Sequence, residues 1–306
     1  FKTFPICEIK TAPYFLQISS SLSFGDKLGY KTFVLQGGED PYFTDEIMVE
    51  IIKKIKGKYP YNAITLSLGE RSYESYERMF KAGADRYLLR HETASKELYE
   101  SLHPNSSFEN RRKCLENLKK IGYQIGAGFM VGLPKQTNND LVNDLLYLKE
   151  LNPHMCGIGP FIPHKDTPLY NENCGTLEKT ITMLALVRLM LPKVLLPATT
   201  ALGSIDPLGR EKGLKAGGNV VMPNLSPTNV REKYLLYDGK ICTGDEAAEC
   251  RACIEKRINK AGFKLNISRG DSLVLSEEEI NNINKNIKIE KIIKENLDNI
   301  SLVKKG

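Results

Sequence analysis

The chain has 306 residues, 41% of them hydrophobic and 26% charged, and its formal net charge at pH 7 is +6. This composition is typical of a globular protein with a core of ordinary size. No apolar run reaches the roughly 18 residues of a membrane-spanning helix, and the lysines are scattered among acidic residues. We therefore expect no membrane segment and no nucleic-acid-binding surface.

From Lys31 onward, strand-like and helix-like segments alternate with a short period. β-branched and apolar runs bounded by glycine predict strands, and apolar residues at helical spacing behind Ser, Thr or Asn predict helices. The predicted strands cover 32–36, 63–68, 87–90, 124–131, 155–161, 195–201 and 219–223. The predicted helices begin at Thr44, Ser72, Ser107, Asn138, Thr176 and Pro207.

Strict alternation of strand and helix predicts an α/β protein with a parallel sheet. Seven such units in about 200 residues favour a (β/α) TIM-type barrel that lacks the first βα unit. Residues 1–28 have no clear period and form an atypical N-terminal segment, residues 29–260 form the barrel, and residues 261–306 form a partly helical extension. The chain begins at Phe1 and not at Met, as a fragment would.

The functional site of such a barrel lies at the carboxyl ends of its strands. Gly37, Gly38 and Glu39 follow the first predicted strand. Glycine lets a ligand approach the backbone closely, and the Glu39 carboxylate can accept hydrogen bonds from an ammonium group. A double glycine after a strand is also common in plain turns.

Charged residues follow the third strand. Arg90 and Glu92 are two residues apart, so on a strand they face the same side, and an inward charged pair is costly unless it binds something. We interpret this pair as functional. Arg111 lies one turn into a predicted helix and can hold a carboxylate in bidentate fashion, although alone it also suits a surface position. Thr199 and Thr200 offer hydroxyls, one of which must face the lumen.

Three of the seven cysteines are clustered as Cys242-x7-Cys250-x2-Cys253. Such spacing can hold zinc or an iron–sulfur cluster, although zinc needs a fourth ligand, and incidental thiols are the alternative. The opening residues lack the pattern of a secretory signal, so we predict reduced thiols in a cytoplasmic protein.

Seven motifs, in order between residues 28 and 272, resemble a known family. They are TFVLQGGEDPY (32–42), TLSLGE (65–70), AGADRYLLRHETA (82–94), GAGFMVGLPKQT (126–137), GIGPFIPHKDTP (157–168), PATTAL (197–202) and GGNVVMP (217–223). Together they resemble the radical S-adenosylmethionine (SAM) maturases of [FeFe]-hydrogenase, the HydE family. Biotin synthase and methylornithine synthase are similar to that family.

The resemblance implies a radical SAM barrel with a biotin/thiamin-synthesis-associated C-terminal part. It implies an enzyme that forms a 5′-deoxyadenosyl radical during assembly of the hydrogenase H-cluster. The implied SAM-binding residues are Gly37, Gly38, Glu39, Ser67, Glu92 and Arg111. The implied substrate-binding residues are Thr65, Arg90, Thr199, Thr200, Met222 and Tyr234. The implied ligands of an accessory iron–sulfur cluster are Cys242, Cys250 and Cys253.

The family also holds a [4Fe–4S] cluster on a C-x3-C-x2-C loop, and the 306 residues contain no such loop. Cys7 is the only cysteine before Cys114. A shifted reading frame or a mispredicted start at residues 1–28 is one explanation. A paralogue that has lost radical chemistry is the other.

The resemblance implies a small-molecule or organometallic substrate and other hydrogenase maturases as partners, with no nucleic acid and no membrane. Two alternatives remain open. One is a related radical SAM synthase acting on a small amino acid, like methylornithine synthase or biotin synthase, although Cys156 alone is too little for the second cluster of biotin synthase. The other is a non-catalytic SAM-binding paralogue.

Overall fold

A computed structural model describes residues 21–226, 237–241 and 247–275. The strands are β1 (Thr32–Gln36), β2 (Ala63–Ser67), β3 (Arg86–Leu88), β4 (Gln124–Ala127), β5 (Met130–Val131), β6 (Met155–Cys156) and β7 (Gly159–Pro160). The helices are α2 (Asp45–Lys58), α3 (Tyr73–Lys81), α4 (Lys96–Leu102), α5 (Phe108–Ile121), α6 (Asn138–Leu151), α7 (Leu177–Met190), α8 (Thr200–Ile205), α9 (Gly209–Lys215) and α11 (Ala247–Lys260). Residues 21–27 are also helical.

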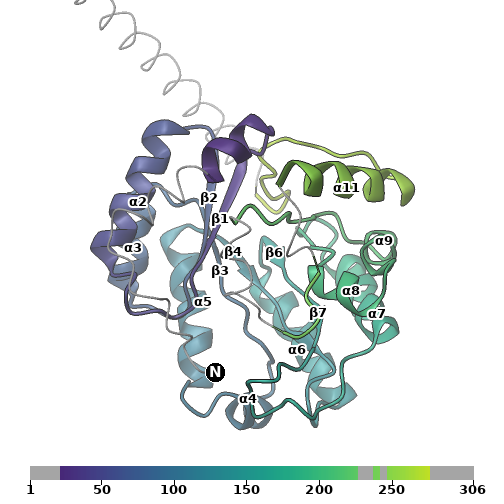
Figure 1. The fold of residues 1–306 in the computed structure, drawn as a ribbon. Coiled ribbons are helices and arrows are strands. Elements are labelled where there is room, and N and C mark those ends of the chain that lie inside the picture. The colour runs from purple at the N-terminus through teal and green to yellow at the C-terminus, as the bar shows by residue number, and fades with distance from the viewer. Residues whose placement is uncertain (1–20, 227–236, 242–246, 276–306) are drawn as a thin grey trace, which may run out of the picture.

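The strands form a parallel sheet in the order β1-β2-β3-β4-β6. Single parallel bridges continue it from Met155 to Leu195 and from Pro197 to Val220. Helices α2, α3 and α5 lie on one flank of these strands and α6 to α9 on the other (Figure 1). This is the predicted α/β barrel architecture, and among the described residues β1 stands at one edge of the five-stranded sheet.

The helices begin where the sequence places capping residues. The Thr44 hydroxyl accepts a hydrogen bond from the amide of Ile47 at the start of α2, and Ser107 does the same at the start of α5. Gly122 ends α5 in the left-handed conformation, with φ of 108°. At α6, Thr137 and Asp140 form a reciprocal capping box. Each cap satisfies backbone amides that the first helical turn leaves without partners.

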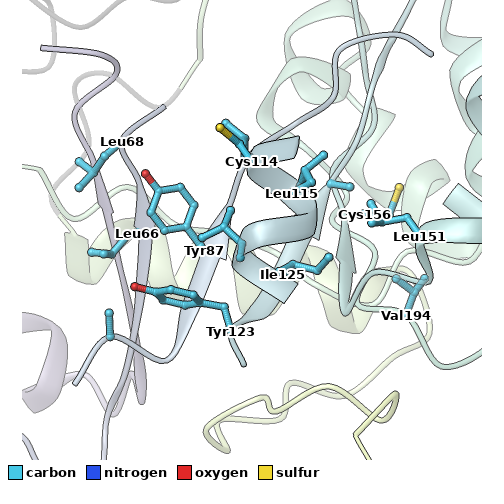
Figure 2. Packing of buried hydrophobic residues seen from close by; sticks show 14 of the residues in the cluster. Leu66, Leu68, Tyr87, Cys114, Leu115, Tyr123, Ile125, Leu151, Cys156 and Val194 are labelled. Carbon is cyan, nitrogen blue, oxygen red and sulfur yellow. The ribbon is translucent and has the colours of Figure 1, made fainter. Parts of the chain in front are cut away.

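The main core lies between the outer face of the sheet and the helices. Leu66, Tyr87 and Ile125 come from neighbouring strands and are fully buried, and Figure 2 shows them beside residues of α5. The rings of Tyr87 and Tyr123 meet edge to face with centroids 5.7 Å apart. Because side chains alternate along a strand, Thr65, Arg86 and Gln124 point to the opposite side, where they line an internal cavity.

A segment from the C-terminal part of the described chain closes the amino-terminal end of the strands. Arg86, only 5% exposed, donates hydrogen bonds to the carbonyl of Arg269 at 3.0 Å and to Asp271 at 2.9 Å. Gln124 also donates to Asp271, and the Ser272 hydroxyl donates to the carbonyl of His154. These charged and polar partners seal the barrel at the end opposite the strand carboxyl ends.

Two predicted strands are interrupted where two glycines meet. The strand predicted over 124–131 divides into β4 and β5, and the one over 155–161 into β6 and β7. A Cβ atom on Gly128, whose φ is +154°, would lie 2.0 Å from the carbonyl oxygen of Gly157. The backbones therefore approach each other at a distance that only glycine allows, and both strands bend there.

Other boundaries were wrong. The strand predicted over 195–201 is reduced to single bridges at Leu195 and Pro197, and Thr199 is already the N-cap of α8. The strand predicted over 219–223 is reduced to a bridge at Val220. Helix α4 was not predicted. The amphipathic helix expected in the last residues lies outside the described part, and the proposed division at residues 28 and 260 remains a prediction.

No helix among the described residues is long and apolar enough to span a membrane.

The closed end of the barrel generates a stability prediction. Burial alone would raise the pKa of Asp271, but Arg269 and Arg86 hold it below its usual value. Asp271→Asn should lower the free energy of unfolding by about 2 kcal/mol at pH 7, because it leaves buried Arg86 without its counter-charge; the 19% exposure of Asp271 reduces the full cost of breaking a buried pair. Urea denaturation measures the difference.

The difference in unfolding free energy between wild type and Asp271→Asn should depend on pH. A carboxyl with a lowered pKa stabilises the fold above its unfolded pKa of about 3.9, and this contribution disappears as the pH falls through the folded pKa. The difference between wild type and Asp271→Asn should therefore shrink below about pH 4. Asp26→Asn, in the more exposed pair with Lys31, is the control and should change stability by less than about 1 kcal/mol. Equal effects of the two substitutions would contradict the buried role of Asp271.

Candidate functional site

The carboxyl ends of β1 and β2 lie side by side because the strands pair in register, with Gln36 opposite Ser67. The amide of Gly37 donates to the carbonyl of Ser67 at 3.2 Å. Gly38 has φ of +62°, and no atom would contact a Cβ placed on it. The turn therefore offers open backbone at Gly38, at the mouth of the barrel.

Glu39 and Arg111 meet at this mouth. Their charged groups are 3.7 Å apart, and the Glu39 carboxylate accepts a hydrogen bond from the amide of Glu70 at 3.1 Å. The Glu39 side chain is 54% exposed, whereas that of Arg111 is 12% exposed. The structure thus brings together a residue of the turn after β1 and a residue of α5, both among the predicted cofactor-binding positions.

Glu70 is the stronger partner of Arg111. Its carboxylate lies 2.8 Å from Nε of Arg111 and also accepts from Ser106 and Asn110. Burial lowers the pKa of the Arg111 guanidinium, but the Tyr99 hydroxyl, Glu70 and Glu92 outweigh it, so that the pKa is raised overall. Arg111 is therefore held as a fixed cation at the mouth.

Arg90 and Glu92 form an ion pair, with 3.3 Å between Nε and Oε1. The sequence analysis placed both residues on a strand, with side chains facing the same side. Strand β3 ends at Leu88, so their proximity has another origin. Instead, Glu92 adopts a left-handed backbone with φ of 66°. Its second carboxylate oxygen, Oε2, is buried and has no hydrogen-bond partner among the described residues.

The predicted substrate residues occupy different positions. Thr65 is 4% exposed and lines the internal cavity, and Met222 is 38% exposed. The Thr199 hydroxyl is buried without a partner in the described chain, 3.2 Å from where a Cβ on Gly159 would lie. The Thr200 hydroxyl accepts from the buried Arg210 at 3.2 Å. Of the two threonines, Thr199 is the one whose hydroxyl is left for a ligand.

The cysteine triad is described only in part. Cys242 and Tyr234 lie outside the described residues, Cys250 is on α11, and Cys253 is exposed one turn later on the same helix. Within the described ranges, no group of three or more His, Cys, Asp or Glu side chains could hold a metal ion. The accessory cluster therefore remains a prediction.

The described residues do not fit a [4Fe–4S] cluster. Their free cysteines are Cys114, Cys156, Cys174 and Cys253. Cys114 and Cys156 are buried behind the sheet, where burial raises the pKa of both thiols and disfavours the thiolates that iron needs. We derive no chemical step through such a cluster.

The residues at the mouth fit SAM better. Its methionine part carries an ammonium and a carboxylate, and the mouth offers the unpartnered Glu92 oxygen for the first and the fixed Arg111 cation for the second. The open turn at Gly38 leaves room for a ligand against the backbone.

Comparison with known proteins identifies the family. The model of the radical SAM superfamily matches residues 21–148. The [FeFe] hydrogenase maturase subunit HydE of Thermotoga maritima is 53% identical over 238 residues, which are 78% of this chain and 68% of that protein. The chain belongs to the HydE family of radical SAM enzymes. Its resemblance to that family, inferred from seven motifs, is confirmed.

More distant relatives agree with the HydE-like fold. The 3-methylornithine synthase of Methanosarcina acetivorans is 31% identical over 69% of this chain and 59% of its own length. The crystal structure of methylornithine synthase (PylB) superposes with a TM-score of 0.71 at 24% identity, covering 85% of this chain and 76% of that one. The maturase HydG of Carboxydothermus hydrogenoformans gives 0.66 at 23% identity, over 81% and 58%. These two likenesses concern the fold alone.

Sequence reasoning missed three residues around the mouth. Glu70 is the last residue of the TLSLGE motif but was given no role, and His91 and Asp144 were not singled out. Glu70 follows Gly69 at a strand end, a signal that could have been used, whereas Asp144 sits inside an ordinary amphipathic helix. Its contact with His91 depends on how α6 lies against the segment that follows β3 and could not be predicted from local pattern.

The arrangement around Arg111 predicts that Glu70 stabilises the mouth. Glu70→Gln should lower the free energy of unfolding by about 2 kcal/mol, because Arg111 then lacks a full counter-charge in a largely buried position. Chemical denaturation measures this loss. Glu109→Gln, at an exposed position on α5, should cost less than about 1 kcal/mol. If both variants unfold at the same denaturant concentration, Glu70 does not have this role.

Proposed function

We propose that this chain binds SAM at the carboxyl ends of β1 to β3 and acts in maturation of the [FeFe]-hydrogenase H-cluster. The unpartnered Oε2 of Glu92 carries the proposal. A buried carboxylate oxygen without a donor costs free energy unless a ligand satisfies it. Family membership supports the radical SAM class and the maturation role.

Each charged group at the mouth has a distinct task in this proposal. The guanidinium of Arg111 binds the SAM carboxylate, and its contact with Glu70 fixes its direction in advance. Glu92 accepts from the SAM ammonium group through Oε2, while Arg90 holds Oε1. Glu39 and the open turn at Gly38 receive the same amino end from the side of β1.

In this family, one electron from a [4Fe–4S] cluster cleaves the sulfonium of SAM into methionine and a 5′-deoxyadenosyl radical; because the described residues do not fit that cluster, we assign them no part in this step. This chain's own residues orient the molecule and exclude water from its methionine end. The substrate, small or organometallic, would lie deeper in the lumen near Thr65, Arg90 and Thr199. The unpartnered Thr199 hydroxyl supports this placement.

Isothermal titration calorimetry with SAM tests the site directly. Arg111→Lys should weaken binding about tenfold, because lysine cannot form the paired hydrogen bonds of a guanidinium with a carboxylate. Arg112→Lys is the matched control. Its guanidinium stacks on the ring of Tyr147, 4.3 Å from the centroid, and its substitution should leave SAM affinity unchanged.

Two results would count against the proposal. One is absence of SAM binding by the wild-type protein. The other is equal loss of affinity in Arg111→Lys and Arg112→Lys, which would trace the effect to the fold of α5 and not to a contact with the ligand.

A further inference from the structure

We infer that Asp144 and His91 form a buried positioning pair that holds Glu92 in the conformation needed at the mouth. The inference rests on the proposed function, because it assumes that Glu92 binds SAM. It assigns a role to two residues that do not themselves reach the ligand. Asp144 lies on α6, outside the strand ends where binding residues were sought.

Asp144 lies in the middle of α6 and is fully buried. Its Oδ1 accepts hydrogen bonds from Nε2 of His91 at 3.3 Å and from the amide of Ala94 at 2.5 Å. One carboxylate oxygen thereby holds the chain on both sides of Glu92. A carboxylate at this depth is costly, so its retention inside an otherwise apolar helix face calls for a function.

His91 connects Asp144 to the backbone of Gly128, which follows β4. The amide of Gly128 donates to Nδ1 of His91 at 3.3 Å, so this nitrogen carries no proton and Nε2 is the donor to Asp144. The rings of Phe129 and Tyr147 flank the imidazole, at 5.9 Å and 4.9 Å between centroids. The ring is therefore fixed in both position and tautomer.

Glu92 stands between these two attachments with φ of 66°. A left-handed conformation is unfavourable for a residue with a side chain and persists only when its surroundings enforce it. The amide of Glu92 donates to the carbonyl of Gly128 at 3.0 Å, and the amide of Met130 donates back to Glu92 at 3.3 Å. The conformation places the Glu92 carboxylate against Arg90, and no described residue donates to Oε2.

If the attachments are removed, Glu92 can relax to a common backbone conformation and its carboxylate leaves the mouth. Asp144→Leu removes both accepted hydrogen bonds and keeps a side chain that branches at Cγ. His91→Phe keeps a ring between Phe129 and Tyr147 but breaks the link between Asp144 and Gly128. Asp144→Asn keeps an oxygen that can accept from both donors. If Asp144→Leu and His91→Phe lose SAM affinity and Asp144→Asn keeps it, the hydrogen bonds of Asp144 position Glu92 and its negative charge is not required.

The test combines two readouts on the full chain. SAM affinity by calorimetry should fall about tenfold in Asp144→Leu and in His91→Phe, and by less than about threefold in Asp144→Asn. Hydrogen exchange by mass spectrometry should show faster exchange of the amides at 92 and 94 in Asp144→Leu. In a Glu92→Gln background, Asp144→Leu should give much less than its tenfold effect, because both act through the same carboxylate.

Asp85→Asn is the control for general destabilisation. Asp85 pairs with Lys56 and Arg269 at the opposite end of the barrel, so its substitution should lower stability without changing SAM affinity. If the wild type does not bind SAM, the proposed function fails. If the wild type binds and Glu92→Gln weakens binding while folded Asp144→Leu and His91→Phe do not, the positioning role alone is wrong.

Discussion

The arrangement of the mouth depends on the backbone pairing of parallel strands. Gln36 pairs with Ser67, so the residues that follow β1 and β2 emerge at the same level. Every contact among Glu39, Glu70 and Arg111 presupposes this alignment, because a shift of β1 by one residue would reverse which side chains face the lumen. The backbone hydrogen bonds between β1 and β2 thus fix the positions of the charged side chains at the mouth.

The two ends of the barrel use similar charges for opposite purposes. At the closed end, Oδ1 of Asp271 accepts from Arg86, Gln124 and Arg269. At the mouth, Oε2 of Glu92 has no donor among the described residues. Carboxylates whose donors come from the protein stabilise the fold, whereas one left without a donor is destabilising until a ligand provides it. The carboxylates of Asp271 and Glu92 therefore differ in how many of their donors the described residues supply.

Local patterns predicted the repeating βα units well, because caps such as Thr44 and alternating apolar residues act over a few positions. They failed where a distant segment decides the outcome. Gly128 divides a predicted strand where Gly157 comes close to it, and the left-handed Glu92 lies between two residues, His91 and Ala94, that both contact Asp144 of α6. The candidate site residues were predicted from motif resemblance and strand position, while their partners, Glu70 and Asp144, required the packed structure.

The closed end also bears on how the chain folds as it is synthesised. The hydroxyl of Thr32 bonds to the carbonyl of Arg269, and Arg86 to Asp271, across separations of 237 and 185 residues. A nascent chain can pair β1 to β4 long before Arg269 has been made. Until then Arg86 remains hydrated in an open-ended lumen, and its desolvation waits for the last contacts. Long-range closure of this kind slows folding and leaves the partly built barrel exposed to chaperones and to aggregation.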